Sequence, residues 1–232
     1  MTTLLVSPEL FAGAELRVEG DSYRHLFRAR RLAAGERLRV VDGRGRARSA
    51  EVARVDRSGA TLALGDPAPA NEPAFRLELL VAVFRPERAA WLVEKATEVG
   101  VAAVRFLHTE RAPRTFGAGT FERLRRVAAA AVEQCGRSLL PEVTGVHAWS
   151  ELERLAAALP DRRVLDTAAE GSGWRGPSAA AGALLVGPEG GWTDTERAAA
   201  RALAFIPAAL GPRTLRTETA ALAGAARLLL AA

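Results

Sequence analysis

Two short apolar runs near the end of the chain each lead into a glycine-bearing turn. Residues 184–186 (LLV) precede the turn 187–191 (GPEGG), and residues 208–210 (AAL) precede 211–213 (GPR). A strand that ends in glycines leaves bare backbone open to a ligand, and a helix that follows offers unpaired N–H groups. In open α/β sheets, ligands bind beside the carboxyl ends of the strands. The stretch therefore predicts an α/β sheet with a binding site at these turns.

A helix with recognisable ends is expected between the two turns. Thr193 fits the N-cap position, and Glu196 follows at the spacing of a capping box. Asp194 adds negative charge to the first turn, where the helix dipole favours it. A single GPEGG stretch is as well explained by an ordinary tight turn without a ligand. Two such turns close together, the second followed by Arg216 and Glu218, favour a site.

The remainder of the second half alternates strand and helix patterns. Residues 77–84 (LELLVAVF) form a near-continuous apolar run, which is typical of a strand covered on both faces. Residues 87–100 then predict a helix, with Gly100 as its C-cap. Further strands are expected at 101–107 and 163–167, and further helices at 122–137, 151–159 and 219–232.

The first third of the chain has a different pattern, that of several short strands. Residues 38–41 run into Asp42-Gly43, a hairpin signal, residues 47–55 alternate, and residues 61–64 follow a Ser-Gly turn. These strands predict a small barrel. Three prolines fall within residues 66–73, which predicts a linker between two domains.

The chain is basic, with a net charge of +5 and a pI near 10.7, and Lys95 is its only lysine. That excess suits a polyanionic partner, although an inert basic surface is the alternative. In residues 23–31, Tyr23 and Phe27 are interleaved with arginines. This pattern fits phosphate contacts plus stacking on bases; a solvated face with buried aromatic rings is the alternative.

Other features exclude several classes of protein. Cys135 is the only cysteine, so an intramolecular disulfide is excluded, and the three histidines are scattered without metal-ligand spacing. A Walker motif and a GxGxxG after a strand are both missing, which argues against a nucleotidase and a Rossmann-type enzyme. The start of the chain does not resemble a signal peptide, and no uncharged apolar run reaches about 18 residues. We therefore expect a cytoplasmic protein.

Several motifs together resemble one family. The stretches 187–196 (GPEGGWTDTE), 210–222 (LGPRTLRTETAAL), 94–101 (EKATEVGV), 109–111 (TER) and 133–137 (EQCGR) are similar to the bacterial 16S ribosomal RNA uridine N3-methyltransferases, which are SPOUT, or α/β-knot, methyltransferases. The resemblance covers nearly the whole chain and is most specific at the C-terminal motifs.

The resemblance implies two domains. Residues 1–70 would form a PUA-like β-barrel that binds RNA, and residues 74–232 a SPOUT α/β-knot methyltransferase domain with a mostly parallel sheet and a deep trefoil knot. The family also implies a homodimer with the site near the interface. The scattered histidines and the single cysteine predict no metal.

The chemistry implied is methyl transfer from S-adenosylmethionine to N3 of a uridine in 16S ribosomal RNA of the small subunit. Neutral N3 carries a proton and is a poor nucleophile, so the enzyme must favour the deprotonated base, and fixed positive charge does this. We expect Arg216 to supply that charge or to hold the base. Glu218 would accept the N3 proton or orient Arg216, and Glu110 is the alternative base. An ion-paired helix entrance is the alternative for Arg216 and Glu218.

The family pattern also indicates which residues hold the methyl donor and which contact RNA. The methyl-donor residues expected are Leu165, Thr167, Gly187, Pro188, Glu189, Gly190, Gly191, Leu210, Gly211, Leu215, Arg216 and Thr219. The RNA-binding residues expected are Arg24, Arg28, Arg30, Arg31, Lys95, Arg111, Gln134, Arg137 and Arg213.

Two other functions remain open from the sequence. A SPOUT ribose 2′-O-methyltransferase would share the first turn but typically has a final motif with Asn and Ser, where this chain has LRTETA. A non-catalytic RNA-binding or ribosome-assembly protein could keep the scaffold, but the intact glycine turns disfavour it. The chain also departs from the family at Arg85, where a lysine is expected, and at Ala112, where a serine is expected.

Overall fold

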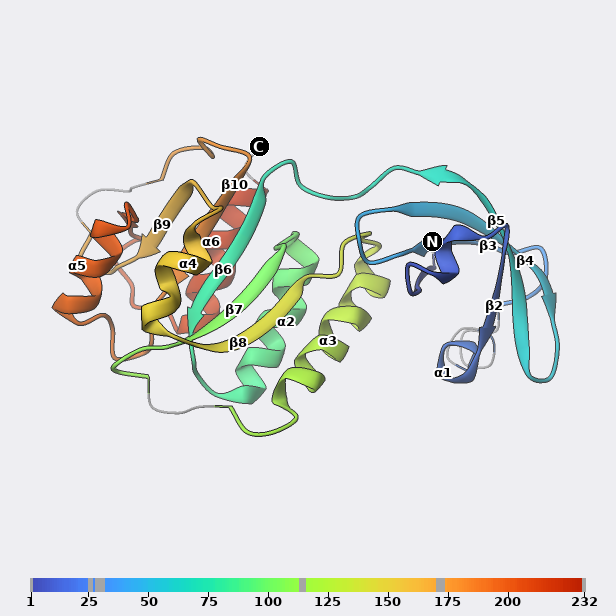
Figure 1. Ribbon diagram of the computed structural model, residues 1–232, viewed down its shortest axis with the longest axis horizontal. Coiled ribbons are helices and arrows are strands. Elements are labelled where there is room, and N and C mark those ends of the chain that lie inside the picture. Colours follow the sequence, from blue (N-terminus) through green and yellow to red (C-terminus); the bar gives the residue numbers. More distant parts are fainter. Residues whose placement is uncertain (1, 25–26, 28–31, 113–115, 170–173, 231–232) are drawn as a thin grey trace. The chain divides into compact units, whose positions relative to one another are not determined.

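The computed structural model describes residues 2–24, 27, 32–112, 116–169 and 174–230 (Figure 1). Arg28, Arg30 and Arg31 lie outside these described residues. The chain divides into two compact units. Unit 1 comprises Met1–Glu72 with Ala129–Leu140, and unit 2 comprises Pro73–Ala128 with Pro141–Ala232. None of the helices in the described ranges combines the length and the apolar character that crossing a bilayer requires.

Unit 1 is built on one five-stranded sheet that forms a half-barrel, in the part of the chain where the strand pattern predicted a small barrel. Its strands are β1 (Thr3–Leu5), β2 (Glu15–Glu19), β3 (Arg37–Val41), β4 (Ala47–Val55) and β5 (Gly59–Ala68). They are ordered β1-β3-β4-β5-β2, so β1 and β2 are the edges. The hairpin expected at Asp42-Gly43 joins β3 to β4, and Gly43 has the positive φ of 71° that such a turn favours.

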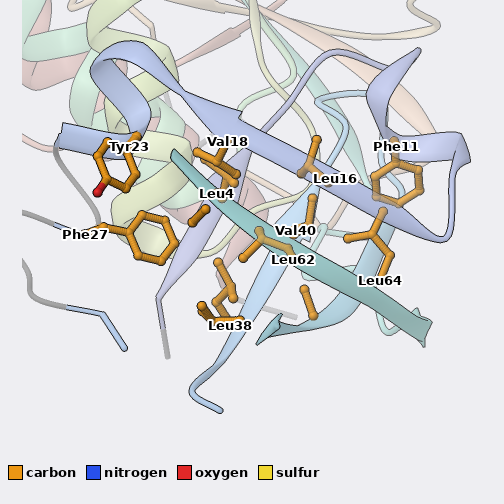
Figure 2. Close-up of a cluster of buried hydrophobic side chains, with 13 residues drawn as sticks. Leu4, Phe11, Leu16, Val18, Tyr23, Phe27, Leu38, Val40, Leu62 and Leu64 are labelled. Atoms are coloured by element: carbon orange, nitrogen blue, oxygen red, sulfur yellow. The ribbon is translucent and has the colours of Figure 1, made fainter. Parts of the chain in front are cut away.

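The core of unit 1 follows from the alternation of apolar residues along these strands. Leu16 and Val18 of β2, Leu38 of β3 and Leu62 of β5 point toward one another (Figure 2). The short helices η1 (Leu10–Ala12) and α1 (Gly20–Tyr23) add Phe11 and Tyr23 to this cluster.

Tyr23 and Phe27 belong to this core. Their rings stack with centroids 5.6 Å apart, and each residue is only 7% exposed. The expectation that they stack on bases is therefore wrong, because both rings are used inside the protein.

The linker expected over residues 66–73 is shorter than the prolines suggested. Strand β5 continues to Ala68, where Ala68 pairs with Ala47 and Pro67 pairs with Arg48. Proline has no N–H to donate to a neighbouring strand. It is tolerated here because the β4–β5 pairing is irregular between Arg48 and Ala50.

Glu72 binds the segment 137–139 of unit 1. Its Oε2 accepts hydrogen bonds from Arg137 Nε and Nη2 at 3.0 and 2.8 Å, and its Oε1 accepts from the amides of Ser138 and Leu139 at 2.8 and 2.9 Å. Arg137 is 3% exposed. The arginine that the family pattern assigned to RNA is therefore part of the internal structure of unit 1.

We predict that Glu72→Ala destabilises unit 1 by about 3–5 kcal/mol, because it removes the carboxylate partner of a buried guanidinium. The measurement is chemical denaturation followed by circular dichroism. The matched control is Glu51→Ala, which removes an exposed carboxylate 3.8 Å from Arg37 and should change stability by less than about 0.5 kcal/mol. Equal losses in the two variants would contradict this account of Glu72.

Unit 2 is a six-stranded sheet in which all neighbours are parallel, as the buried apolar run at 77–84 predicted. The strand order is β11-β9-β10-β6-β7-β8. The strands are β6 (Arg76–Ala82), β7 (Ala103–His108), β8 (Glu142–Ala148), β9 (Asp161–Leu165), β10 (Ala181–Val186) and β11 (Ile206–Ala208).

Helices cover both faces of this sheet (Figure 1). They are α2 (Pro86–Val99), the part of α3 (Thr120–Cys135) up to Ala128, the short η3 (Trp149–Glu151), α4 (Leu152–Ala156), α5 (Asp194–Ala202) and α6 (Thr217–Leu229). Leu185 packs in one cluster with residues of α4 and α5, whereas its neighbour Leu184 lies under Gly224 of α6. Because successive strand residues face opposite ways, α4 with α5 and α6 with its neighbour α2 lie on opposite faces.

Several predicted boundaries are confirmed and others shift. Gly100 is the C-cap of α2 with a φ of 102°, and Thr193 is the N-cap of α5. The last helix begins at Thr217, two residues before the expected start, and the helix expected over 151–159 is reduced to α4 and η3. Thr167 lies beyond the end of β9 rather than in it.

Candidate functional site

Three adjacent strands of unit 2 end at the same level. In the parallel pairing of β9 with its neighbours, Leu165 is opposite Val186 of β10 and Ala208 of β11. The segments that begin at Asp166, Gly187 and Ala209 therefore leave the same edge of the sheet. The two glycine turns lie close together, as expected, and the segment after β9 lies beside them.

A cavity of about 150 Å³ lies among these three segments. Nine of the twelve residues expected to hold the methyl donor line it: Leu165, Thr167, Gly187, Pro188, Glu189, Gly191, Leu210, Gly211 and Leu215. Gly190, Arg216 and Thr219 are not among its lining residues, whereas Arg213, which was expected at RNA, is.

The bare backbone at the two turns is open. Gly191 has a φ of 68°, and its amide donates to Pro188 O at 2.9 Å, which closes the turn. Gly211 has a φ of 97°. A Cβ added at either glycine would meet no heavy atom within 4 Å. The positive φ explains why glycine is needed, and the open space leaves room for a ligand against the backbone.

Glycine is needed at position 187 for a different reason, which is the close approach of a neighbouring ring. An added Cβ there would lie 2.8 Å from the ring of Trp192. Trp192 is 3% exposed and its Nε1 donates to Leu165 O at 2.8 Å, while Thr217 Oγ1 donates to Gly187 O at 3.0 Å. The end of β9, the first turn and the start of α6 are thereby linked to one another.

Sequence reasoning missed several residues of this cavity. They are Asp166, Val186, Trp192, Arg197, Ala208, Ala209, Thr214, Thr217 and Ala220. Trp192 and Thr217 lie inside the two motifs and could have been included on that signal. The sequence carries no comparable signal for the pairing of Asp166 with Arg197.

Asp166 and Arg197 form an ion pair in the cavity wall, with Arg197 Nε 2.7 Å from Asp166 Oδ2. Burial alone would raise the pKa of Asp166, but hydrogen bonds from the Arg197 guanidinium and the Ala168 amide outweigh burial and hold that pKa below its ordinary value. The hydrogen bond to Asp166 raises the pKa of Arg197. Both groups therefore stay charged near neutral pH.

The capping box of α5 is confirmed, and its glutamate also binds the segment after β7. The Glu196 amide donates to Thr193 Oγ1 at 3.2 Å, and the Thr193 amide donates to Glu196 Oε2 at 2.9 Å. Glu196 Oε1 also accepts from the Glu110 amide at 3.0 Å. The neighbouring Arg111 Nη1 donates to Gly190 O at 3.0 Å. The segment after β7 is thus fastened to the first turn, while the Glu110 side chain is exposed.

Glu218 is buried at the start of α6. It is 7% exposed, and its Oε1 lies 3.6 Å from Arg88 Nε of α2. Its Oε2 is one of the few buried atoms in the described residues that lack a hydrogen-bond partner. Arg88 Nη1 also donates to Glu189 Oε1 at 2.9 Å. Arg216, two residues before Glu218, is the exposed N-cap of α6.

The residues expected to bind RNA have varied surroundings. Arg24 is exposed and pairs with Asp21, and Gln134 is exposed on α3. Lys95 donates to Glu94 and Glu98 at 2.7 and 2.8 Å, which raises the pKa of Lys95 to about 12. Within the residues that the structure describes, no group of acidic, histidine and cysteine side chains could hold a metal ion.

Comparison with known proteins defines the class. Residues 71–229 match the model of an RNA methyltransferase domain, and residues 18–64 match the model of an RNA methyltransferase PUA domain. These matches confirm the expected pairing of a SPOUT methyltransferase domain with a PUA domain.

Individual relatives narrow the class. Ribosomal RNA small subunit methyltransferase E of Mycobacterium tuberculosis is 32% identical over 90% of this chain and 84% of its own length. The Synechocystis protein of the same name is 30% identical over 94% of this chain and 73% of its own length. The crystal structure of that enzyme from Neisseria gonorrhoeae, bound to S-adenosyl methionine, aligns with a TM-score of 0.85 at 27% identity, covering 97% of this chain and 95% of that one. The chain belongs to the ribosomal RNA small subunit methyltransferase E family.

We predict that Gly187→Ala destabilises the protein by about 1–3 kcal/mol, because the new Cβ overlaps the Trp192 ring in a packed position. Thermal unfolding is the measurement. Gly176→Ala is the matched control, since a Cβ there meets no atom within 4 Å, and it should lower stability by less than about 0.5 kcal/mol. A stable Gly187→Ala protein would show that Trp192 is not fixed against the turn.

Proposed function

We propose that this chain methylates 16S ribosomal RNA of the small subunit at N3 of a uridine, with S-adenosylmethionine as the methyl donor. The observation that carries the proposal is the alignment of Leu165, Val186 and Ala208, which sets three loops around one cavity. Family membership, the names of the relatives and the methyl donor bound in the Neisseria enzyme support it.

The cavity fits a methyl donor of this kind. Gly191 and Gly211 offer backbone that no side chain covers, as close contact with a flat ring or an amino-acid group requires. Leu165, Leu210 and Leu215 provide apolar walls for the adenine. When bound, S-adenosylmethionine supplies an electrophilic methyl group on a positively charged sulfur.

Glu218 is the base that the contacts support best. Its Oε2 has no hydrogen-bond partner and can accept the proton that leaves N3, which frees the N3 lone pair for the new bond to carbon. Arg216 at the start of the same helix supplies positive charge to the uracil anion. Glu110 remains the alternative base, because its exposed side chain belongs to a segment fastened to the first turn.

RNA contacts are proposed for the exposed members of the predicted set. Arg24 and Gln134 belong to unit 1, and Arg111 and Arg213 to unit 2. Lys95 is half-buried between two glutamates and keeps its charge. Arg137 is omitted because Glu72 already binds its guanidinium. Residues 1–70 are proposed as the RNA-binding domain and residues 74–232 as the methyltransferase domain.

Three further expectations belong to this proposal. The enzyme acts as a homodimer with the site near the interface, its methyltransferase domain carries the deep trefoil knot of the α/β-knot enzymes, and it works in the cytoplasm, where ribosomal RNA is modified. These rest on the family resemblance.

The function is tested by mass mapping of methylated nucleosides in 16S ribosomal RNA from cells with and without this protein. We predict that one N3-methyluridine disappears when the gene is deleted and returns when it is restored. A 2′-O-methylated nucleoside lost instead would identify the other SPOUT chemistry. An unchanged pattern, together with no binding of S-adenosylmethionine in calorimetry, would indicate a non-catalytic protein.

The roles of the charged residues are tested by turnover on small subunits from the deletion strain. We predict that Glu218→Gln lowers kcat about 10²- to 10⁴-fold, as loss of a general base does. Arg216→Ala should also lower kcat at saturating substrate, since it removes charge that stabilises the transition state. Glu110→Gln is the matched carboxylate control. If Glu110→Gln abolishes turnover while Glu218→Gln retains it, the base assignment is reversed.

A further inference from the structure

Arg88 has contacts that no motif anticipated. It lies in the first turn of α2, on the face of the sheet where α2 and α6 pack together. Its Nη1 donates to Glu189 Oε1 at 2.9 Å, and its Nε lies 3.6 Å from Glu218 Oε1. One guanidinium therefore pairs with a carboxylate of the first glycine turn and with the buried carboxylate of α6.

The two carboxylates differ in surroundings. The Glu189 side chain is 60% exposed and belongs to the turn that lines the cavity, whereas the Glu218 side chain is 9% exposed. Burying a carboxylate without a partner is costly, and the Arg88 side chain, itself only 27% exposed, supplies a partner for Glu218. The contact with Glu189 is a hydrogen bond of 2.9 Å, and the contact with Glu218, at 3.6 Å, is the more buried ion pair of the two.

A second contact links the same two segments. Thr217 Oγ1 donates to Gly187 O at 3.0 Å, so successive residues of α6 are connected to the turn, one directly and one through Arg88. The Thr217 bond fixes the backbone at the start of α6. The Arg88 bridge fixes the Glu218 side chain and leaves its Oε2 without a protein partner.

We propose that Arg88 is a positioning residue that couples the methyl-donor turn to the base. By holding Glu189 and Glu218 in one arrangement, the guanidinium leaves the second oxygen of Glu218, Oε2, free to accept the proton of N3. Arg88 touches neither reacting atom in this account. The inference rests on the proposed function, because it assigns the proton to Glu218 and the 187–191 turn to the methyl donor.

The test consists of two double-mutant cycles on the full-length protein. The first measures kcat in single turnover on small subunits from the deletion strain, using Arg88→Met, Glu218→Gln and the double variant. The second measures the Kd of S-adenosylmethionine by calorimetry, using Arg88→Met, Glu189→Gln and the double variant. Arg88→Lys tests conservative rescue, since one ammonium cannot reproduce two directed contacts at different nitrogens.

We expect Arg88→Met to lower kcat about tenfold and to raise the Kd about fivefold, as for coupled neighbours. Each loss should shrink to less than about twofold when the partner carboxylate is already replaced, and Arg88→Lys should recover only part of either loss. Arg126→Met is the control, because it removes one exposed guanidinium from the same unit and should leave both quantities within about twofold of wild type.

The outcomes separate the coupling from the function. Equal losses with and without the partner carboxylate, in either cycle, would mean that Arg88 acts independently and would overturn the inference. An Arg88→Met enzyme with wild-type kcat would also overturn it. A Glu218→Gln enzyme with wild-type kcat would instead overturn the base assignment on which the inference rests, and the calorimetric cycle would still report on the link to Glu189.

Discussion

The site depends on the in-register parallel pairing of β9, β10 and β11. Because Leu165, Val186 and Ala208 lie opposite one another, three loops far apart in sequence leave the sheet at one edge. That alignment brings together the three segments that line most of the cavity, and α5 and α6 add Arg197, Thr217 and Ala220. A shift of one residue in any of these strands would reverse the faces of its side chains and move its loop away from the others. The buried contacts around Trp192 and Thr217 then hold the loops at close range.

Local chemistry made much of this site predictable. The backbone has a positive φ at 191 and 211, which favours glycine. The Thr193–Glu196 spacing defines the start of a helix. The apolar run at 77–84 indicates a strand that is covered on both faces. Such signals act within a few residues, so the chain displays them directly. Nine of the twelve residues that the family pattern indicated for the methyl donor line the cavity. The alignment of the strand ends followed only from the general rule for α/β sheets.

Long-range side-chain pairs could not be predicted. The ion pairs are Asp166 with Arg197, Arg88 with Glu189 and Glu218, and Glu72 with Arg137. The sequence around each of these residues does not indicate its partner. A chain rich in arginine offers too many equivalent candidates. Arg137 was predicted to bind RNA, but its guanidinium pairs with Glu72 inside unit 1. Short edge strands such as β1 and β2 also escaped, because three to five residues carry little periodicity.

The central claim is that three loops at one edge of the sheet bind the methyl donor together. Hydrogen–deuterium exchange of the full-length protein with and without S-adenosylmethionine tests this most directly. The account predicts slower exchange in residues 166–169, 187–191 and 209–215 at once, with the amides of the β1–β5 sheet unchanged. Unchanged exchange in those three segments at saturating S-adenosylmethionine, or protection confined to other parts of the chain, would contradict it.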